Sequence, residues 1–233
     1  MSRFTQILKL LPAVLLTQSA FALPNLIQAV NTTANTAITT VDATFSQLHT
    51  VAPFLNPVTL KDALHAYQVA NNEHLVKNQR LTVVDYSLPS NQKRMWVFDM
   101  NTDKLLFKTY VAHGQNSGLT DAKKFSNSDS SKESCLGTFV TMGTYCGHHG
   151  QSLNIQGLEK GYNDHAYSRR IVVHSAAYVA PDYIKSNGRA GRSWGCLAVG
   201  PQIAQQIIQT IKGGSVIFSY YPDAGYLAHS QFA

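Results

Sequence analysis

The chain has 233 residues, 44% of them hydrophobic, and a formal net charge of +6 from 19 Lys and Arg against 13 Asp and Glu. The basic residues are dispersed, with no dense Lys/Arg run, so nucleic acid is not an expected partner. This length is enough for one substantial hydrophobic core with an appended segment.

The first 22 residues have the pattern of a secretory signal peptide. Arg3 and Lys9 precede a short apolar stretch, and Ala20 and Ala22 form an A-x-A cleavage site. The apolar stretch is too short to span a bilayer, so no membrane span is predicted. We therefore expect export to the periplasm or cell envelope; the alternative is an ordinary N-terminal helix.

Two segments precede the main domain. Residues 23–57 are rich in Thr, Asn and Ala and indicate a linker with one short helix. Residues 58–79 have apolar side chains at near-helical spacing, among them Leu60, Leu64 and Tyr67, which predicts a helix packed on the main domain.

Residues 80–223 predict a mainly β catalytic domain with one or two helices. Residues 114–134 form a long polar loop, and residues 200–214 have the pattern of an amphipathic helix. Residues 224–233 are expected to be a C-terminal tail. The strand candidates are short β-branched and aromatic segments at 81–88, 93–100, 104–114, 136–147, 152–158, 169–176 and 215–221.

The three cysteines suggest one bridge and one free thiol. An exported protein folds in an oxidising compartment, where unneeded thiols tend to be paired. We expect a disulfide between Cys135 and Cys146, which leaves Cys196 free and a candidate for reactivity. The alternative is that Cys135 and Cys146 are two free, buried thiols.

The sequence around Cys196 favours a nucleophile. Residues 191–199, GRSWGCLAV, set this cysteine behind a glycine on a polar turn. A cysteine nucleophile needs a base, an exposed position and N–H groups directed at the developing oxyanion. The backbone N–H groups of Gly195 and Cys196 are the expected oxyanion donors, and His174, at the end of an apolar strand, is the expected base. The alternatives are a buried apolar cysteine and an ordinary core or surface histidine.

A strand that ends in His174 and is followed by Ser-x-Gly-Cys resembles the active-site motif of L,D-transpeptidases of the YkuD family. The resemblance is closest to the murein L,D-transpeptidase catalytic domain branch and covers residues 80–222. It rests on five segments in order: VAHGQNSG, FSNSDSSKESCLGTF, GYNDHAYSRRIVVHSAAYV, GRSWGCLAV and IKGG…SYYP.

The resemblance implies a β-sandwich-like catalytic fold, a cell-envelope location and acyl transfer on peptidoglycan stem peptides. Cys196 would attack the carbonyl of the third, diamino acid residue and expel the terminal D-Ala, and the acyl group would pass to an amine of a neighbouring stem, forming a 3–3 cross-link. His174 would accept the thiol proton and later protonate the leaving amine. A backbone carbonyl would orient this histidine. No cofactor is implied, and we expect a monomer.

Two positions depart from the wider family. Trp194 stands where most members have histidine, and Ala198 where most have Asn or Arg. Arg192 is a candidate to hold a substrate carboxylate in their place, because guanidinium binds carboxylates through two hydrogen bonds. The full set of expected substrate-binding residues is Arg192, Ser193, Trp194, Ser175 and His113.

Other chemistries have weaker support. Cys146, His148 and His149 lie close together in sequence, but adjacent histidines of a strand point to opposite faces, so no metal site is predicted. Two alternatives to a transpeptidase remain: an L,D-carboxypeptidase, in which water accepts the acyl group, and a noncatalytic envelope protein that only binds peptidoglycan.

Overall fold

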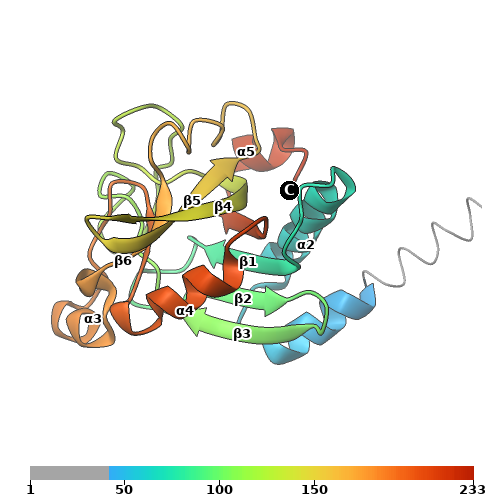
Figure 1. The fold of residues 1–233 in the computed structure, drawn as a ribbon, viewed down its shortest axis with the longest axis horizontal. Helices are drawn as coiled ribbons and strands as arrows, with labels where there is room; N and C mark the ends of the chain where they lie inside the picture. The colour runs from blue at the N-terminus through green and yellow to red at the C-terminus, as the bar shows by residue number, and fades with distance from the viewer. Residues whose placement is uncertain (1–41) are drawn as a thin grey trace, which may run out of the picture. The chain divides into compact units, whose positions relative to one another are not determined.

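The computed structural model describes residues 42–233 (Figure 1). The predicted signal peptide and most of the predicted linker lie outside these residues. Residues 42–51 form a helix within the segment expected to be a linker. None of the helices in the described part of the chain is long and apolar enough to cross a membrane.

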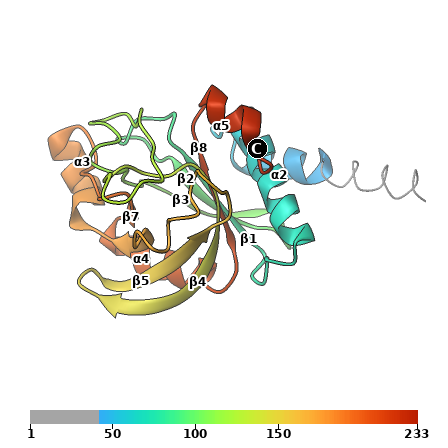
Figure 2. The same ribbon diagram turned by 90° about the horizontal axis from the view of Figure 1, so that it is seen from above.

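Helix α2 (Pro57–Asn72) begins at a capped N-terminus. The Asn56 side chain accepts a hydrogen bond from the Val58 N–H at 2.8 Å, and Pro57 in the first turn needs no hydrogen-bond acceptor. The helix was predicted over 58–79 and ends earlier, at Asn72. Its buried face includes Leu60, Ala63, Leu64, Tyr67 and Ala70. It packs against strands β1 (Arg80–Asp85) and β8 (Val216–Tyr220) (Figure 2).

The predicted mainly β fold class is confirmed. Eight strands form one hydrogen-bonded sheet in the order β3-β2-β1-β8-β4-β5-β6-β7, which Figures 1 and 2 show to be strongly curved. The pairs β1–β8 and β6–β7 are parallel and the other pairs are antiparallel. The strands are β1 (Arg80–Asp85), β2 (Met95–Asp99), β3 (Lys104–Thr109), β4 (Gly137–Gly147), β5 (Gly150–Gly157), β6 (Val172–Ser175), β7 (Leu197–Val199) and β8 (Val216–Tyr220).

Helix α4 (Pro201–Ile211) confirms the amphipathic pattern of residues 200–214. Its buried residues Ala204, Ile207, Ile208 and Ile211 repeat at helical spacing, and it packs against β1, β5 and β6. All residues of β8, and all but the first of β1, are buried. The core therefore lies on both faces of these central strands. Three short helical segments complete the described fold: η1 (Ala177–Val179), α3 (Pro181–Asn187) and α5 (Ala224–His229).

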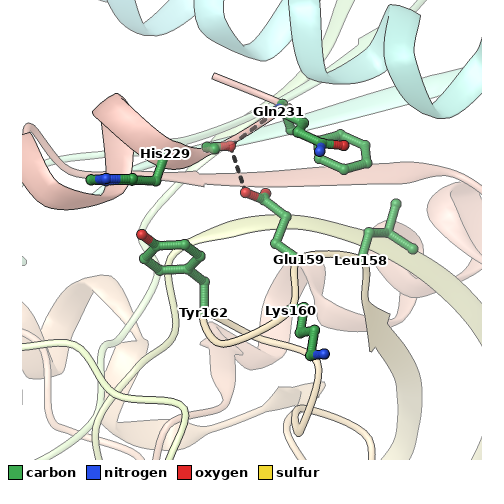
Figure 3. A pocket seen from close by; sticks show the side chains of 8 residues that line it. Leu158, Glu159, Lys160, Tyr162, His229 and Gln231 are labelled. Atoms are coloured by element: carbon green, nitrogen blue, oxygen red, sulfur yellow. Dashed lines mark hydrogen bonds between the residues drawn. The ribbon is translucent and has the colours of Figure 1, made fainter.

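Residues 224–233, expected to be a tail, form α5 and pack on the domain through a buried carboxylate. Glu159 accepts hydrogen bonds at Oε1 from the Thr138 N–H at 2.6 Å and the Tyr226 hydroxyl at 3.1 Å, and at Oε2 from the Ser230 hydroxyl at 2.6 Å. Figure 3 shows this carboxylate in a pocket between the loop after β5 and the C-terminal segment. The buried ring of Phe232 adds an apolar contact to the core.

The predicted disulfide is wrong. Cys135 is buried, Cys146 is exposed, and both are free. Ten residues separate the two cysteines, and nine of them belong to β4, which also contains Cys146. At about 3.3 Å per residue an extended strand holds them roughly 30 Å apart, far beyond the Cα separation that a disulfide tolerates. The intervening residues would close a loop only if the chain turned back between the two cysteines, and here it does not.

Candidate active site

The parallel pair β6–β7 positions the two expected catalytic residues. Its register pairs Val173 with Leu197 and His174 with Ala198. Continued by one residue, the register places Cys196 beside Val172. Cys196 directly precedes β7 and lies two residues before Ala198, the partner of His174, so the strand pair brings Cys196 and His174 into the same part of the sheet.

A tight turn presents Cys196. The Ser193 hydroxyl donates to the Cys196 carbonyl at 2.7 Å and accepts from the Gly195 N–H at 3.1 Å. Gly195 has φ +117°, and a Cβ at this position would lie 2.6 Å from the Glu133 carbonyl oxygen. Glycine is therefore required both for the backbone conformation and for the close approach of the neighbouring loop.

Neighbouring segments hold this turn from outside. The Ser193 N–H donates to the His113 carbonyl at 2.9 Å, and the Ser193 carbonyl accepts from the Gln115 N–H at 2.8 Å. The Ser193 side chain is buried and occupied within the turn. Ser193 was expected to bind substrate, but its hydroxyl is already hydrogen-bonded within the turn. Its role in this structure is to shape the turn.

His174 is oriented by the backbone. Its Nδ1 lies 2.8 Å from the Ser175 carbonyl oxygen, so Nδ1 carries the proton in the neutral ring and Nε2 is left as the proton acceptor. The Ser175 carbonyl thus supplies the contact that the family resemblance implied. Burial is the main cause that lowers the pKa of His174, and the nearby His149 lowers it further.

The Cys196 thiol rests against the backbone. Its Sγ lies 3.5 Å from the Arg170 carbonyl oxygen. Within residues 42–233 it makes no hydrogen bond to the His174 ring. Burial raises the pKa of Cys196, an effect offset in part by the Val172 N–H and by the charge of Arg169. The thiol and the imidazole are therefore both neutral in this arrangement.

His113 is a structural residue and not part of a substrate site. It is fully buried, its Nδ1 lies 2.7 Å from Arg94 Nη2, and its Nε2 lies 3.3 Å from the Gly118 carbonyl oxygen. Burial and the neighbouring Arg94 lower the pKa of His113 to about 4, which keeps the ring neutral. The sequence placed it at the end of a strand but contained no sign of the buried arginine against it.

Arg192 is exposed, as a ligand for substrate would be, but its Nη1 donates to the Gln115 carbonyl at 2.9 Å and the Gly118 carbonyl at 3.3 Å. It therefore ties the loop after His113 to the catalytic turn. The Gly195 N–H, expected to contact the oxyanion, is likewise occupied by the Ser193 hydroxyl. Of the two expected oxyanion donors, this contact leaves Cys196 N–H as the candidate.

Trp194, two residues before Cys196, is 69% exposed and borders a pocket. Lys132 Nζ lies 4.7 Å from the centre of its ring. Arg169, another lining residue, is engaged by the Ser126 and Glu133 carbonyls and so shapes the pocket wall. The complete lining is Asp129, Ser130, Lys132, Ser168, Arg169 and Trp194.

Lys132 was not singled out by the sequence analysis, although it lies in the long polar loop predicted at residues 114–134. Ser130 and Lys132 both adopt a left-handed backbone, with φ +57° at each, which is unfavourable for residues other than glycine. Asn116 holds this conformation: its side chain donates to the Ser131 carbonyl at 2.8 Å and its N–H to the Lys132 carbonyl at 3.2 Å. The loop is therefore fixed with Lys132 over Trp194.

Comparison with protein-family models identifies the family of this chain. The family model for the L,D-transpeptidase catalytic domain matches residues 52–220, most of the chain, and the protein belongs to this family. The match includes His174, Trp194 and Cys196. A comparison with curated protein sequences finds no match.

Solved structures with a similar fold carry related names. An L,D-transpeptidase from Mycobacterium smegmatis is 18% identical, with a TM-score of 0.37, and the alignment covers 61% of this chain and 59% of that one. L,D-transpeptidase 3 from Mycobacterium tuberculosis is 11% identical, with a TM-score of 0.41 and coverage of 61% of each chain. The chain thus spans about three fifths of the length of these proteins.

Proposed function

We propose that the protein is a murein L,D-transpeptidase of the cell envelope that uses Cys196 as nucleophile and His174 as general base. The register of β6 and β7 carries this proposal, because it pairs His174 with Ala198, two residues after Cys196, and so brings the two residues into the same part of the sheet. The Ser175 carbonyl supports it by directing the basic nitrogen of His174 away from the backbone.

The first half-reaction is acylation. His174 Nε2 takes the proton from the Cys196 thiol as sulfur attacks the carbonyl carbon of the diamino acid residue of a stem peptide. The tetrahedral intermediate collapses, the bond to the terminal D-Ala breaks, and the His174 imidazolium gives its proton to the leaving amine. A thioester at Cys196 and free D-Ala result.

The second half-reaction reverses the roles. An amine of a neighbouring stem attacks the thioester carbonyl, and His174 takes a proton from that amine. Cys196 leaves as a thiolate and recovers its proton from His174. The product is a 3–3 cross-link, and the enzyme returns to its neutral starting state.

The resting geometry indicates how attack begins. The thiol lies against the Arg170 carbonyl and must turn toward His174 before it can transfer its proton. Because burial raises the pKa of Cys196 and lowers that of His174, a stable thiolate–imidazolium pair is disfavoured before substrate binds. Proton transfer therefore accompanies attack on the carbonyl, and the Cys196 N–H is the donor we assign to the oxyanion.

The pocket at Trp194 is the proposed binding site for a stem peptide. Trp194 stands two residues before the nucleophile and offers an exposed aromatic surface. Lys132 makes no salt bridge within the described residues and can pair with a stem carboxylate. Asp129 supplies the opposite charge in the same pocket, which suits a diamino acid that carries both an ammonium and a carboxylate group.

An L,D-carboxypeptidase is the second candidate, since it shares acylation and differs only in using water as acceptor. We favour transfer, because the long loop that carries Lys132 and the exposed ring of Trp194 form walls against which a second stem can bind. The deciding experiment incubates the mature protein with purified tetrapeptide muropeptides and follows the products by mass spectrometry.

A transpeptidase produces 3–3 cross-linked dimers together with free D-Ala. Tripeptide as the sole product at high acceptor concentration would establish the carboxypeptidase. Binding to peptidoglycan without release of D-Ala would contradict catalysis and identify a noncatalytic binding protein. Cys196→Ala is the matched control, because it removes the sulfur and keeps the turn.

A further inference from the structure

We propose that His149 is a positioning residue for His174: the tip of the β4–β5 hairpin places its imidazole flat against the catalytic ring. This inference rests on the proposed role of His174 as base. It assigns a function to one of the two adjacent histidines that the sequence suggested only as a weak metal site.

The hairpin geometry selects His149 over its neighbour. Gly147 pairs with Gly150, so His148 and His149 alone form the two-residue turn. Gly150 has φ +74°, a conformation that glycine adopts readily and that lets so short a turn close. The turn joins two long strands of the same sheet that carries His174, which brings its tip across β6.

The contact is between ring faces. The centroids of His149 and His174 lie 4.3 Å apart, with an interplanar angle of 21°. His148 instead meets His149 edge-on, at 5.3 Å and 71°. His149 is itself exposed, whereas His174 is only 3% exposed. One face of the catalytic ring is therefore covered by a residue that remains open to solvent.

Two contacts together hold the His174 ring. The Ser175 carbonyl fixes its rotation through Nδ1, and the His149 ring fixes the plane in which it lies. Nε2 then keeps a constant direction relative to Cys196. A displacement of about 1 Å in such a group can cost up to two orders of magnitude in rate.

The stacked His149 ring also has an electrostatic effect on His174. The groups that face His174 from packed elements are His149 from the hairpin and the Ser175 carbonyl from its own strand, and His148 faces His149. A positive charge on His149 would oppose a positive charge on His174, so this neighbour adds to the effect of burial in lowering the pKa of His174. The imidazolium formed during catalysis is in turn a stronger acid toward the leaving amine.

The first test is independent of any substrate. The titration of His174 is followed by NMR of its imidazole resonances, assigned with His174→Gln, in wild type, His149→Phe and His148→Phe. His149→Phe retains an aromatic plane and removes the charge, so the His174 midpoint should move to higher pH. His148→Phe should leave it unchanged. An unchanged midpoint in His149→Phe, or equal shifts in both variants, would overturn the proposal.

The second test separates position from charge. His149→Ala should lower kcat for D-Ala release about tenfold with KM unchanged, whereas His149→Phe should restore kcat to within about threefold of wild type at pH 8. Failure of Phe to rescue, or a loss confined to KM, would contradict a positioning role. If wild type releases no D-Ala, the proposed function fails, and the NMR titration alone decides the role of His149.

Discussion

His174 Nδ1 and the Ser175 carbonyl oxygen lie 2.8 Å apart, so the proposed base is oriented by the residue that follows it on the same strand. In a histidine–carboxylate pair, a buried negative charge would stabilise the imidazolium. A neutral carbonyl orients the ring with much less electrostatic stabilisation of its protonated form. Burial of the ring is the largest effect and lowers the pKa of His174, whereas the hydrogen bond to the Ser175 carbonyl raises it, so the net shift favours the neutral base.

Cys196→Ala and Cys196→Ser should both abolish D-Ala release and leave the fold intact. The Ser193 hydroxyl bonds to the backbone of this turn and not to the sulfur, so the turn survives either change. Activity is measured on tetrapeptide muropeptides, and folding by thermal unfolding. Cys146→Ser, at an exposed position, is the control and should remain active. Turnover by Cys196→Ala at the wild-type rate would remove Cys196 from the mechanism.

The titration of His174, the proposed base, should appear in the pH dependence of the rate. Activity requires neutral His174 and falls as pH drops through its pKa, which burial lowers from the ordinary histidine value of about 6.5. The acid limb of kcat/KM should therefore lie below that value. His174→Ala should lose at least two orders of magnitude, a loss typical of a general base. An acid limb that persists unchanged in residual His174→Ala activity would assign it to another group.

Local pattern was sufficient for most of the fold. Alternating β-branched and aromatic residues predicted seven of the eight strands, all but β7, and the spacing of Ile207, Ile208 and Ile211 predicted α4. The polar turn before Cys196 predicted a nucleophile there, and that role stays a prediction. These signals are local, so they survive without knowledge of tertiary contacts.

Contacts between residues that are distant in sequence could not be predicted from local pattern. The disulfide failed because the number of residues between two cysteines does not show whether the chain runs straight or turns back. His113 was expected to bind substrate, but the structure shows that its ring contacts Arg94, a residue distant in sequence. Likewise, nothing local indicates that His149 stacks on His174 or that Lys132 lies over Trp194.

The buried carboxylate of Glu159 should be a large contributor to stability. Glu159→Gln leaves an amide NH₂ in place of one acceptor oxygen, so the bonds from Thr138, Tyr226 and Ser230 cannot all be kept. We expect a loss of about 1–3 kcal/mol in the free energy of unfolding, measured in urea. The exposed Glu73→Gln is the control and should be nearly neutral. Equal stability of the two variants would contradict a role for Glu159 in anchoring α5.

The resemblance to L,D-transpeptidases implies that a carbapenem, whose strained amide mimics the substrate, should acylate Cys196. The thiol attacks the strained lactam carbonyl and the ring nitrogen takes a proton, which leaves an adduct of the full mass of the drug. Intact-mass spectrometry should find one adduct on wild type and none on Cys196→Ala. Absence of any adduct after long incubation with several carbapenems would count against the assigned nucleophile.

Substrate recognition should depend on Lys132 and Trp194. Lys132→Ala removes a cation that no carboxylate of the described residues neutralises through a salt bridge, and the loss of one charge-assisted hydrogen bond raises KM about tenfold. Trp194→Ala should raise KM to a similar extent by removing the aromatic surface. The kcat of both should stay within about threefold of wild type, because neither side chain contacts His174. Lys212→Ala, at an exposed lysine at the end of α4, is the matched control.

A stem peptide with an amidated side-chain carboxylate should bind wild type and Lys132→Ala equally well. If the amidated peptide still distinguishes the two proteins, Lys132 contacts another group of the stem.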